Sequence, residues 1–431
     1  MSNQTLPEIW YDYHMKTTVV IAEFNPFHNG HKYILDQAGN LTSSDYIVVI
    51  MSGSFVQRGE PAFMHKNDRV KAALNSGADV VLELPVSYST ATAETFAFGA
   101  VSIADQIGVT DCLAFGAEHA DLDNIKTVAE TLTNPSAELT ASIESGIRKG
   151  LSYPAARAAA LPDNADILKE PNNILAIEYL KALIKTKSSI TPFPVKRIGN
   201  AYNDGSLISE YPSALSIRNM INTGDDQIAW DSLRKSMPKA AFKILSEAYK
   251  KTAPISINDL SSILDHIMIG SEASYLSSYQ DMNPDIACRL IRSYNEMLDN
   301  AYKNASPFTI DSLLKSMRTK ELTYSRLSRA LIHVVLGLKD LTTDNSGALL
   351  PCPYTRILGF KKDASALMRK LSDCSAIPLI NKPADAEKML REHAYEFFDS
   401  TIRSDRLYDS LIKNKYGTIL NDTCRQGPMI I

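Results

Sequence analysis

The sequence predicts an α/β protein in which a parallel sheet covered by helices is followed by a mainly α-helical C-terminal domain. From residue 16 onward, short runs rich in β-branched residues alternate with segments of helical period, which is typical of parallel sheets with helical crossovers. After about residue 223 these runs give way to amphipathic helices. We therefore expect an N-terminal extension at 1–14, an α/β domain at 15–224 and the helical domain at 225–431.

Continuous apolar runs are expected to form the first four strands, because strands of a parallel sheet are buried on both faces. These strands are expected at 19–22, 47–51, 79–84 and 112–115. Helical period places helices between them at about 30–38, 67–76 and 93–107.

Prolines mark the last elements of the α/β domain. Pro171 opens a helix at 172–185, since proline is well tolerated in a first turn. Pro192 and Pro194 place the strand expected at 190–197 at an edge of the sheet. The helical domain is expected to contain helices at 231–249, 257–269, 285–302 and 310–316. Weaker signals predict a small βαβ unit added to that domain, with strands at 356–360 and 377–380 and helices at 363–371, 385–399 and 402–414.

Length and composition narrow the functional classes. At 431 residues the chain is long enough for two or three domains, and 45% hydrophobic with 22% charged residues is ordinary for a globular protein. The net charge of −4 means that a nucleic-acid partner must bind a local basic patch. Five dispersed cysteines without a C-x-x-C pair favour a reducing cytoplasm over a disulfide framework or a zinc ribbon. No run approaches the ~18 apolar residues of a membrane span.

The sharpest motif is AEFNPFHNGH at 22–31, where the first strand passes into the first helix. Ligands of doubly wound sheets bind at this carboxyl edge. His28 and His31 can donate hydrogen bonds to a phosphate there, and the amides and dipole of the helix N-terminus add to the attraction. Gly30 leaves space for a nucleotide against the backbone. The alternative is that His28 caps the helix and His31 fills a gap in the core.

The His28-x-Gly30-His31 box resembles the signature of the HIGH-type nucleotidyltransferase superfamily. A longer series of motifs resembles the bacterial tRNA(Met) cytidine acetate ligase family: VIAEFNPFHNGHKY at 20–33, MSGSFVQRGEP at 51–61, FGAE at 115–118, PNNIL at 171–175 and SALSIR at 213–218. The resemblance implies a Rossmann-like nucleotidyltransferase domain. It also implies a cytoplasmic enzyme that activates acetate with ATP to acetyl-adenylate and acetylates the exocyclic amine of the wobble cytidine of elongator tRNA(Met), which gives 4-acetylcytidine.

The resemblance implies the site residues as well. It places the acting groups at His28, His31, Ser216 and Arg218, with Mg²⁺ bound mainly through ATP oxygens rather than by a protein metal site. It places ATP against Ile21, Ala22, Glu23, Phe24, Asn25, Pro26, Phe27, His28, Asn29, Gly30, His31, Lys32, Tyr33, Ile34, Gly116, Asn173, Arg197 and Ile198. From the residues alone, Gly116 closes a strand at the same crevice, where a turn glycine is equally expected.

Other positions of these motifs have structural alternatives. Asn173 lies in the first turn of a helix, where asparagine is a favoured cap. Ser213 can cap the helix that carries Arg218, which would then be solvated. Arg58, Arg69 and, more weakly, Lys66 are candidates for phosphate or acetate, or for surface roles.

A basic segment in the helical domain is the candidate tRNA contact. It contains Lys315, Arg318, Lys320, Arg326 and Arg329 with a single acid, Glu321, and a tyrosine, Tyr324, that can stack on a base. A solvated helix face would have the same composition.

Two other functions remain open from the sequence. The same boxes would serve another HIGH-type nucleotidyltransferase that acts on a small phosphorylated metabolite, or a non-catalytic nucleotide-binding or RNA-binding protein. An aminoacyl-tRNA synthetase is disfavoured, because no lysine-containing KMSKS-like box stands at 213–218. The sequence leaves the oligomeric state open.

Overall fold

The computed structural model describes residues 15–198, 211–222, 226–304 and 307–431, so the extension expected at 1–14 lies outside the described residues. Within them, one large sheet has the strand order β10-β8-β5-β2-β1-β6-β7, and β9 pairs with β8. The strands are β1 (Thr17–Ala22), β2 (Tyr46–Ser52), β5 (Val80–Leu84), β6 (Cys112–Ala117), β7 (Thr191–Lys196), β8 (Thr355–Phe360), β9 (Leu379–Ile380) and β10 (Met429–Ile430). The prediction of an α/β fold with a mostly parallel sheet is confirmed.

The five strands from β5 to β7 are all parallel, and side chains alternate between two buried faces. Val19 of β1 contributes to one core, and Val20, the next residue, contributes to the other. This double burial explains the continuous apolar runs of the sequence. β7 lies at the end of the sheet, as its prolines predict.

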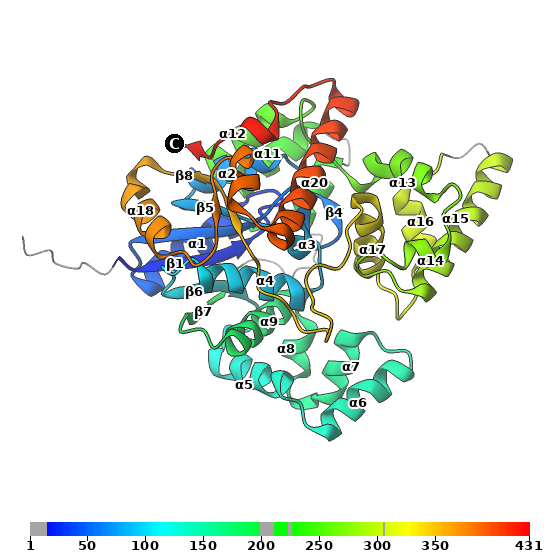
Figure 1. Cartoon of the computed structure of the whole chain (residues 1–431), viewed down its shortest axis with the longest axis horizontal. Coiled ribbons are helices and arrows are strands. Elements are labelled where there is room, and N and C mark those ends of the chain that lie inside the picture. The colour runs from blue at the N-terminus through cyan, green and yellow to red at the C-terminus, as the bar shows by residue number, and fades with distance from the viewer. Residues whose placement is uncertain (1–14, 199–210, 223–225, 305–306) are drawn as a thin grey trace, which may run out of the picture.

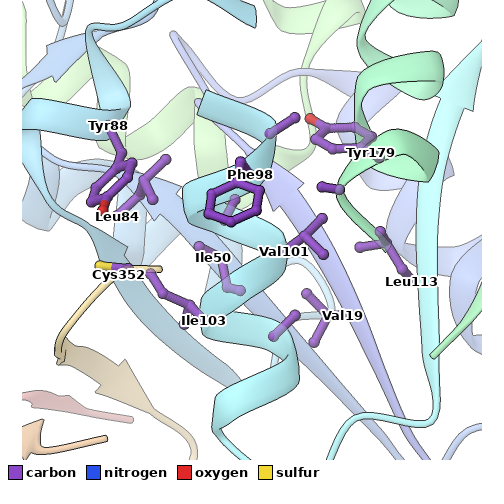
Figure 2. Packing of buried hydrophobic residues seen from close by; sticks show 14 of the residues in the cluster. Val19, Ile50, Leu84, Tyr88, Phe98, Val101, Ile103, Leu113, Tyr179 and Cys352 are labelled. Carbon is purple, nitrogen blue, oxygen red and sulfur yellow. The ribbon is translucent and has the colours of Figure 1, made fainter. Parts of the chain in front are cut away.

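Helices cover both faces of the sheet (Figure 1). One face is covered by α1 (Asn29–Thr42), α2 (Lys66–Leu74), α10 (Ala214–Asn222), α11 (Asp226–Ser236) and α12 (Lys239–Ala248). The opposite face is covered by α4 (Ala93–Gln106), α5 (Leu122–Thr133), α9 (Pro171–Thr186) and α18 (Ser365–Cys374). Figure 2 shows Val101 and Ile103 of α4 packed over Val19 and Ile50 of the sheet.

Three short helices follow α5 and were not predicted: α6 (Ala137–Arg148), α7 (Tyr153–Ala160) and α8 (Ala165–Lys169). Figure 1 shows α6 and α7 at one end of the molecule, below the helical region.

A third core lies in that helical region. It is formed mainly by α13 (Ser261–Met268), α14 (Ala273–Leu276), α15 (Pro284–Asn304), α16 (Ile310–Met317) and α17 (Tyr324–Leu336). A hairpin that follows β2, with strands β3 (Phe55–Val56) and β4 (Glu60–Pro61), and the short helix α3 (Val86–Ser89) also contribute to it. The helical region is therefore packed against the α/β region rather than only tethered to it.

The βαβ unit predicted at the C-terminus is present, since β8 and β9 are parallel neighbours with α18 between them, but its expected place in the helical domain is wrong. β8 pairs antiparallel with β5 and so extends the main sheet, while β9 and β10 add to β8. The two helices expected at 385–399 and 402–414 form one continuous helix, α20 (Glu392–Tyr416), preceded by the short α19 (Ala386–Met389). The helix expected at 231–249 is divided into α11 and α12 at Pro238, because proline cannot donate the helical hydrogen bond.

Candidate active site

A cavity of about 440 Å³ lies at the carboxyl ends of β1 and β6. Its lining includes His28 and His31 at the start of α1, Gly116 of β6 and Arg218 of α10. This is the edge of a doubly wound sheet at which ligands bind, and it is where the sequence predicts the site.

The turn between β1 and α1 is held by hydrogen bonds to later segments of the chain. Arg69 of α2 donates through Nη1 to the carbonyls of Glu23, at 2.8 Å, and Ser52, at 3.0 Å. Asn25 accepts the backbone N–H of Phe63 at its side-chain oxygen, at 2.6 Å. These bonds hold Phe24 at a φ of 49°, a left-handed conformation uncommon for non-glycine residues.

His28 and His31 form a capping box at the start of α1. The Nδ1 atom of His28 accepts the N–H of Gly30 at 3.0 Å, and Nδ1 of His31 accepts the N–H of His28 at 3.3 Å. Their rings stack with centroids 3.7 Å apart. Because Nδ1 accepts in both rings, the proton of each neutral imidazole is on Nε2, which remains available as a donor. Capping and phosphate binding, alternatives in the sequence, are thus compatible.

Gly30 does not line the cavity. A Cβ atom at this position would lie 2.8 Å from Cε1 and 3.0 Å from Nδ1 of His28. The glycine therefore makes room for the capping ring rather than for a nucleotide.

Both imidazoles are held in the neutral form. Burial, with the nearby positive charge of Arg197, lowers the pKa of His28 from 6.5 to about 3. Burial, with His28 and Arg197, also lowers the pKa of His31 well below its ordinary value. At neutral pH the two rings act as hydrogen-bond donors without a charge.

Positive charge is supplied by arginines. Arg58, Arg197, Arg218 and Arg329 all line the cavity. Arg218 is fixed by its Nη1 donating to the carbonyl of Asn25 at 2.8 Å. Burial lowers the pKa of Arg58 and that of Arg197 from 12.5, yet a guanidinium stays protonated at neutral pH. The cavity suits an anionic ligand.

Gly116 faces the cavity, as predicted, between Ile34 of α1 and Arg197 after β7. A Cβ atom there would lie 3.1 Å from Cδ1 of Ile34 and 3.5 Å from Cγ of Arg197. A side chain would therefore crowd the space between these residues.

About half of the residues expected to bind ATP or to act on it line the cavity. They are Ile21, Ala22, Glu23, Phe24, Asn25, His28, His31, Ile34, Gly116, Arg197 and Arg218. Those that do not line it are Pro26, Phe27, Asn29, Gly30, Lys32, Tyr33, Asn173, Ile198 and Ser216. Asn29 donates to the carbonyl of Lys235 at 2.8 Å, and Lys32 pairs with Asp36 at the surface.

Two expected site residues are replaced at the cavity by a neighbour in the same motif. Ser216 is buried, and Ser213, whose Oγ accepts the N–H of Ser216 at 3.1 Å, lines the cavity instead. Asn173 is buried and accepts the N–H of His119 at 3.1 Å, whereas Asn172 lines the cavity.

Of the three further basic candidates, only Arg58 lines the cavity. Arg69 is buried and donates to backbone carbonyls. Lys66 is buried in an ion-pair cluster with Glu83 and Asp405. Both are buried and bound to other groups of the protein, so the surface role expected as the alternative is wrong for these two residues.

Sequence reasoning missed several lining residues. Phe96 of α4 and Tyr179 of α9 carry no motif of their own, and Gln57 lies in the motif at 51–61 but was not named as a site residue. Ser325 and Arg329 of α17 also line the cavity, although the sequence suggested this segment only as a tRNA contact. Arg329 is oriented by Asp281, whose Oδ2 lies 3.2 Å from its Nε.

The described residues contain neither a candidate metal cluster nor a membrane-spanning helix. No group of three or more His, Cys, Asp or Glu side chains among them could hold a metal ion. No helix in this part of the chain is long and apolar enough to cross a membrane.

Comparison with known proteins agrees with this geometry. A family model described as HIGH Nucleotidyl Transferase matches residues 15–422. A tRNA(Met) cytidine acetate ligase of Acetivibrio thermocellus is 35% identical over 410 residues, which cover 93% of this chain and 96% of that protein. The ligase of Thermosipho melanesiensis is 37% identical over 389 residues, with 88% and 87% covered.

Solved structures give the same result. Apo Thermotoga maritima TmcAL superposes with a TM-score of 0.86 at 26% identity and covers 97% of this chain and 100% of that one. The same protein bound with alpha-thio ATP has a TM-score of 0.83 at 26% identity, with 96% and 99% covered. The chain therefore belongs to the HIGH nucleotidyl transferase family and, within it, to the tRNA(Met) cytidine acetate ligases.

Proposed function

We propose that this chain joins acetate to ATP to form acetyl-adenylate and transfers the acetyl group to the exocyclic amine of the wobble cytidine of elongator tRNA(Met), which gives 4-acetylcytidine. The observation that carries this proposal is the cavity in which His28, His31, Arg197 and Arg218 meet, in a chain of this family. A tRNA substrate fits a cytoplasmic enzyme.

The first step requires charge stabilisation more than a base. Acetate is already ionised at neutral pH, and its oxygen attacks the α-phosphorus of ATP while pyrophosphate leaves. The Nε2–H groups of His28 and His31 donate to the α-phosphate, where negative charge develops. Arg218 and the hydroxyl of Ser213 support the β- and γ-phosphates. Ser213 takes the role that the sequence assigned to Ser216, because it is the serine on the cavity.

Mg²⁺ would enter this site with the nucleotide. The described residues contain no carboxylate-rich cluster that fits a resident divalent ion. ATP oxygens are the usual ligands of such an ion, which neutralises charge on the leaving pyrophosphate.

The activity is tested by omitting one substrate at a time. We expect 4-acetylcytidine in total tRNA only when labelled acetate, ATP and tRNA are all present, because each supplies a different part of the product. Nucleoside analysis measures the product, and pyrophosphate release measures the first step. Pyrophosphate release that needs a phosphorylated cosubstrate rather than acetate would favour the other nucleotidyltransferase activity. Nucleotide binding without turnover would favour a non-catalytic protein.

The tRNA contact is proposed at the basic segment beside the mouth of the cavity. Arg318, Lys320 and Arg326 are exposed there, and Lys315 pairs with Asp311 at 2.7 Å. The same segment approaches the turn after α6, since a Cβ atom at Gly150 would lie 3.0 Å from Oε1 of Glu321. Ser325 and Arg329 of this segment line the cavity itself. The segment therefore lies where a bound tRNA would have to deliver its anticodon base.

Arg326→Glu is expected to weaken tRNA binding and leave acetate-dependent pyrophosphate exchange unchanged. Loss of one phosphate contact should reduce the slope of log affinity against log salt by about 1. Filter binding over a range of salt concentrations measures both quantities. The matched control is Arg369→Glu on α18, an exposed arginine far from α17 (Figure 1). Equal effects of the two substitutions would reject the proposed surface.

A further inference from the structure

The cavity reaches both faces of the sheet, and the two faces differ in chemistry. His28 and His31 lie on the face of α1, where Ile34 packs against the core that contains Val20. Phe96 and Tyr179 lie on the opposite face, in the core formed with α4 and α9. The imidazole face provides donors for a nucleotide, which leaves the other face for a second ligand.

That second face forms what we call the acceptor compartment. Its residues are Ile21, Glu23, Phe96, Phe115, Leu175 and Tyr179. The rings of Phe115 and Tyr179 lie 5.8 Å apart between centroids. Apolar and aromatic walls around one carboxylate suit a flat heterocycle that carries a hydrogen-bond donor, because stacking needs a π-face and the acid needs an N–H partner.

Glu23 is fixed at both ends. Its backbone carbonyl accepts Nη1 of Arg69 at 2.8 Å, and its Oε1 accepts the N–H of Gln57 at 2.7 Å. Within the described part of the chain, no hydrogen bond or ion pair engages Oε2. Glu23 lines the cavity, and a carboxylate that is positioned through one oxygen and has the other without a partner is arranged to meet a ligand.

We propose that Glu23 receives the amine of the wobble cytidine: the base lies in the acceptor compartment, and Oε2 accepts a hydrogen bond from its N4 amine and takes a proton as the amide forms. This assignment rests on the proposed function. The N4 lone pair attacks the carbonyl carbon of acetyl-adenylate, and the C–N bond forms. The bond from that carbon to the phosphate oxygen breaks, and AMP leaves with the electron pair. The N4 proton passes to Glu23 and then to solvent.

The chemistry of cytosine requires such a group. Its exocyclic amine is a weak nucleophile, because the lone pair is delocalised into the ring, and a carboxylate is the side chain that pairs with this amine. Burial raises the pKa of Glu23 above 4.5, although the N–H of Gln57 and the charges of Arg58 and Arg218 oppose the rise. A raised pKa makes the carboxylate a better proton acceptor near neutral pH.

Acetyl transfer should therefore fall as pH decreases through the pKa of Glu23, because the protonated acid cannot accept. The charged and titratable side chains that act on this carboxyl group are Arg58, Arg69, Arg218 and Tyr179. The arginines keep their charge as pH decreases from neutral. Burial, together with the charge of Glu23, raises the pKa of Tyr179, so the tyrosine stays protonated over the same range.

The test is Glu23→Gln in the full-length protein, supplied with acetyl-adenylate and tRNA so that transfer is measured apart from activation. We expect transfer to fall by about 10²-fold or more, the usual contribution of a general base. Transfer is read relative to acetate-dependent ATP–pyrophosphate exchange in the same variant. It should fall more than exchange does, because activation needs no proton acceptor and the amide oxygen still accepts the N–H of Gln57. Glu130→Gln, at an exposed position of α5, is the matched control.

Other outcomes are decisive too. Unchanged transfer in Glu23→Gln overturns the proposal, and so does equal loss of exchange and transfer in a variant that melts like the wild type. If Glu23→Gln unfolds, Glu23→Asp decides, because it keeps the charge. Transfer that falls more than exchange, with a displaced acid limb of the pH profile, supports the assignment, and full transfer rejects it. Absence of acetate-dependent exchange in the wild type would instead reject the proposed function.

Discussion

Replacement of His31 by alanine is expected to lower acetate-dependent ATP–pyrophosphate exchange by about 10²–10³-fold, the usual loss on removing one donor that faces developing charge. The ring lines the cavity, and its Nδ1 is used by the backbone N–H of His28, so Nε2–H is the group available to the α-phosphate. Exchange of labelled pyrophosphate into ATP measures this step without tRNA.

His31→Asn separates the two roles of the ring. Its side-chain oxygen can still accept the N–H of His28, which preserves the cap, but no donor reaches the Nε2 position. We expect this variant to melt near the wild-type temperature and to lose exchange as His31→Ala does. Near-normal exchange in both variants would remove His31 from the reaction.

The pH dependence gives an independent check on the imidazoles. Both rings have a lowered pKa, so exchange should show no inflection near the ordinary histidine value as pH decreases from about 8 to about 6. The folded state should lose stability as pH falls below about 6.5, because both histidines become protonated in the unfolded chain but stay neutral in the folded one. An exchange optimum that tracks protonation near 6.5 would mean that a charged imidazole acts.

The sequence predicts those parts of the fold whose pattern lies within a single strand or helix. Runs such as 47–51 are buried on both faces, and a strand in that position must be apolar throughout, so β2 and its neighbours are visible in the sequence. β8 is also a visible run, but its partner is β5, some 270 residues earlier in the chain. Nothing in either strand encodes that long-range pairing, and for this reason the sequence predicts the C-terminal strands beside the helical domain rather than in the main sheet.

The sequence identifies the motifs that form the site, but it does not show which side chains of each motif face the cavity. Consecutive helical residues point about 100° apart, so a motif at a helix start identifies the turn without saying which side chain faces the ligand. This explains why Asn172 lines the cavity where Asn173 was expected. Ser213 lines it in place of Ser216 because Ser213 lies at the start of α10, whereas Ser216 is buried within the first turn. Residues such as Tyr179 reach the cavity because α9 packs beside it, and no local sequence motif indicates how a helix packs.

A buried ion-pair cluster joins α20 to the sheet. Its disruption is expected to cause a large loss of stability. Asp405 of α20 accepts Arg356 Nη1 at 3.0 Å and Ser54 Oγ at 2.6 Å, and it pairs with Lys66. Glu83 accepts Lys66 at 2.9 Å and lies 3.1 Å from Arg356. All four charged side chains are at most 7% exposed, and the two cations balance the two anions.

Asp405 lies on α20 between residues that belong to two different hydrophobic cores. Phe397, two turns earlier, lies in the core beneath the sheet, whereas Tyr408 and Leu411 lie in the core of the helical region. Loss of the charge balance at Asp405 would therefore affect the attachment of both cores to the same helix.

Asp405→Ala is expected to lower the free energy of unfolding by about 3–5 kcal/mol, because it leaves two buried cations with one anion and removes the partner of Ser54. Urea denaturation measures this loss. The matched control is Asp399→Ala on the same helix, where a half-exposed pair with Arg403 should be worth less than about 1 kcal/mol. Burial alone would raise the pKa of Asp405, yet Lys66 and Arg356 hold it below its ordinary value. The stability that this carboxylate supplies is therefore complete above about pH 4 and decreases at lower pH, so the difference between Asp405→Ala and the wild type should narrow in acid. Equal losses in the two variants at neutral pH would show that the cluster is no stronger than a surface pair.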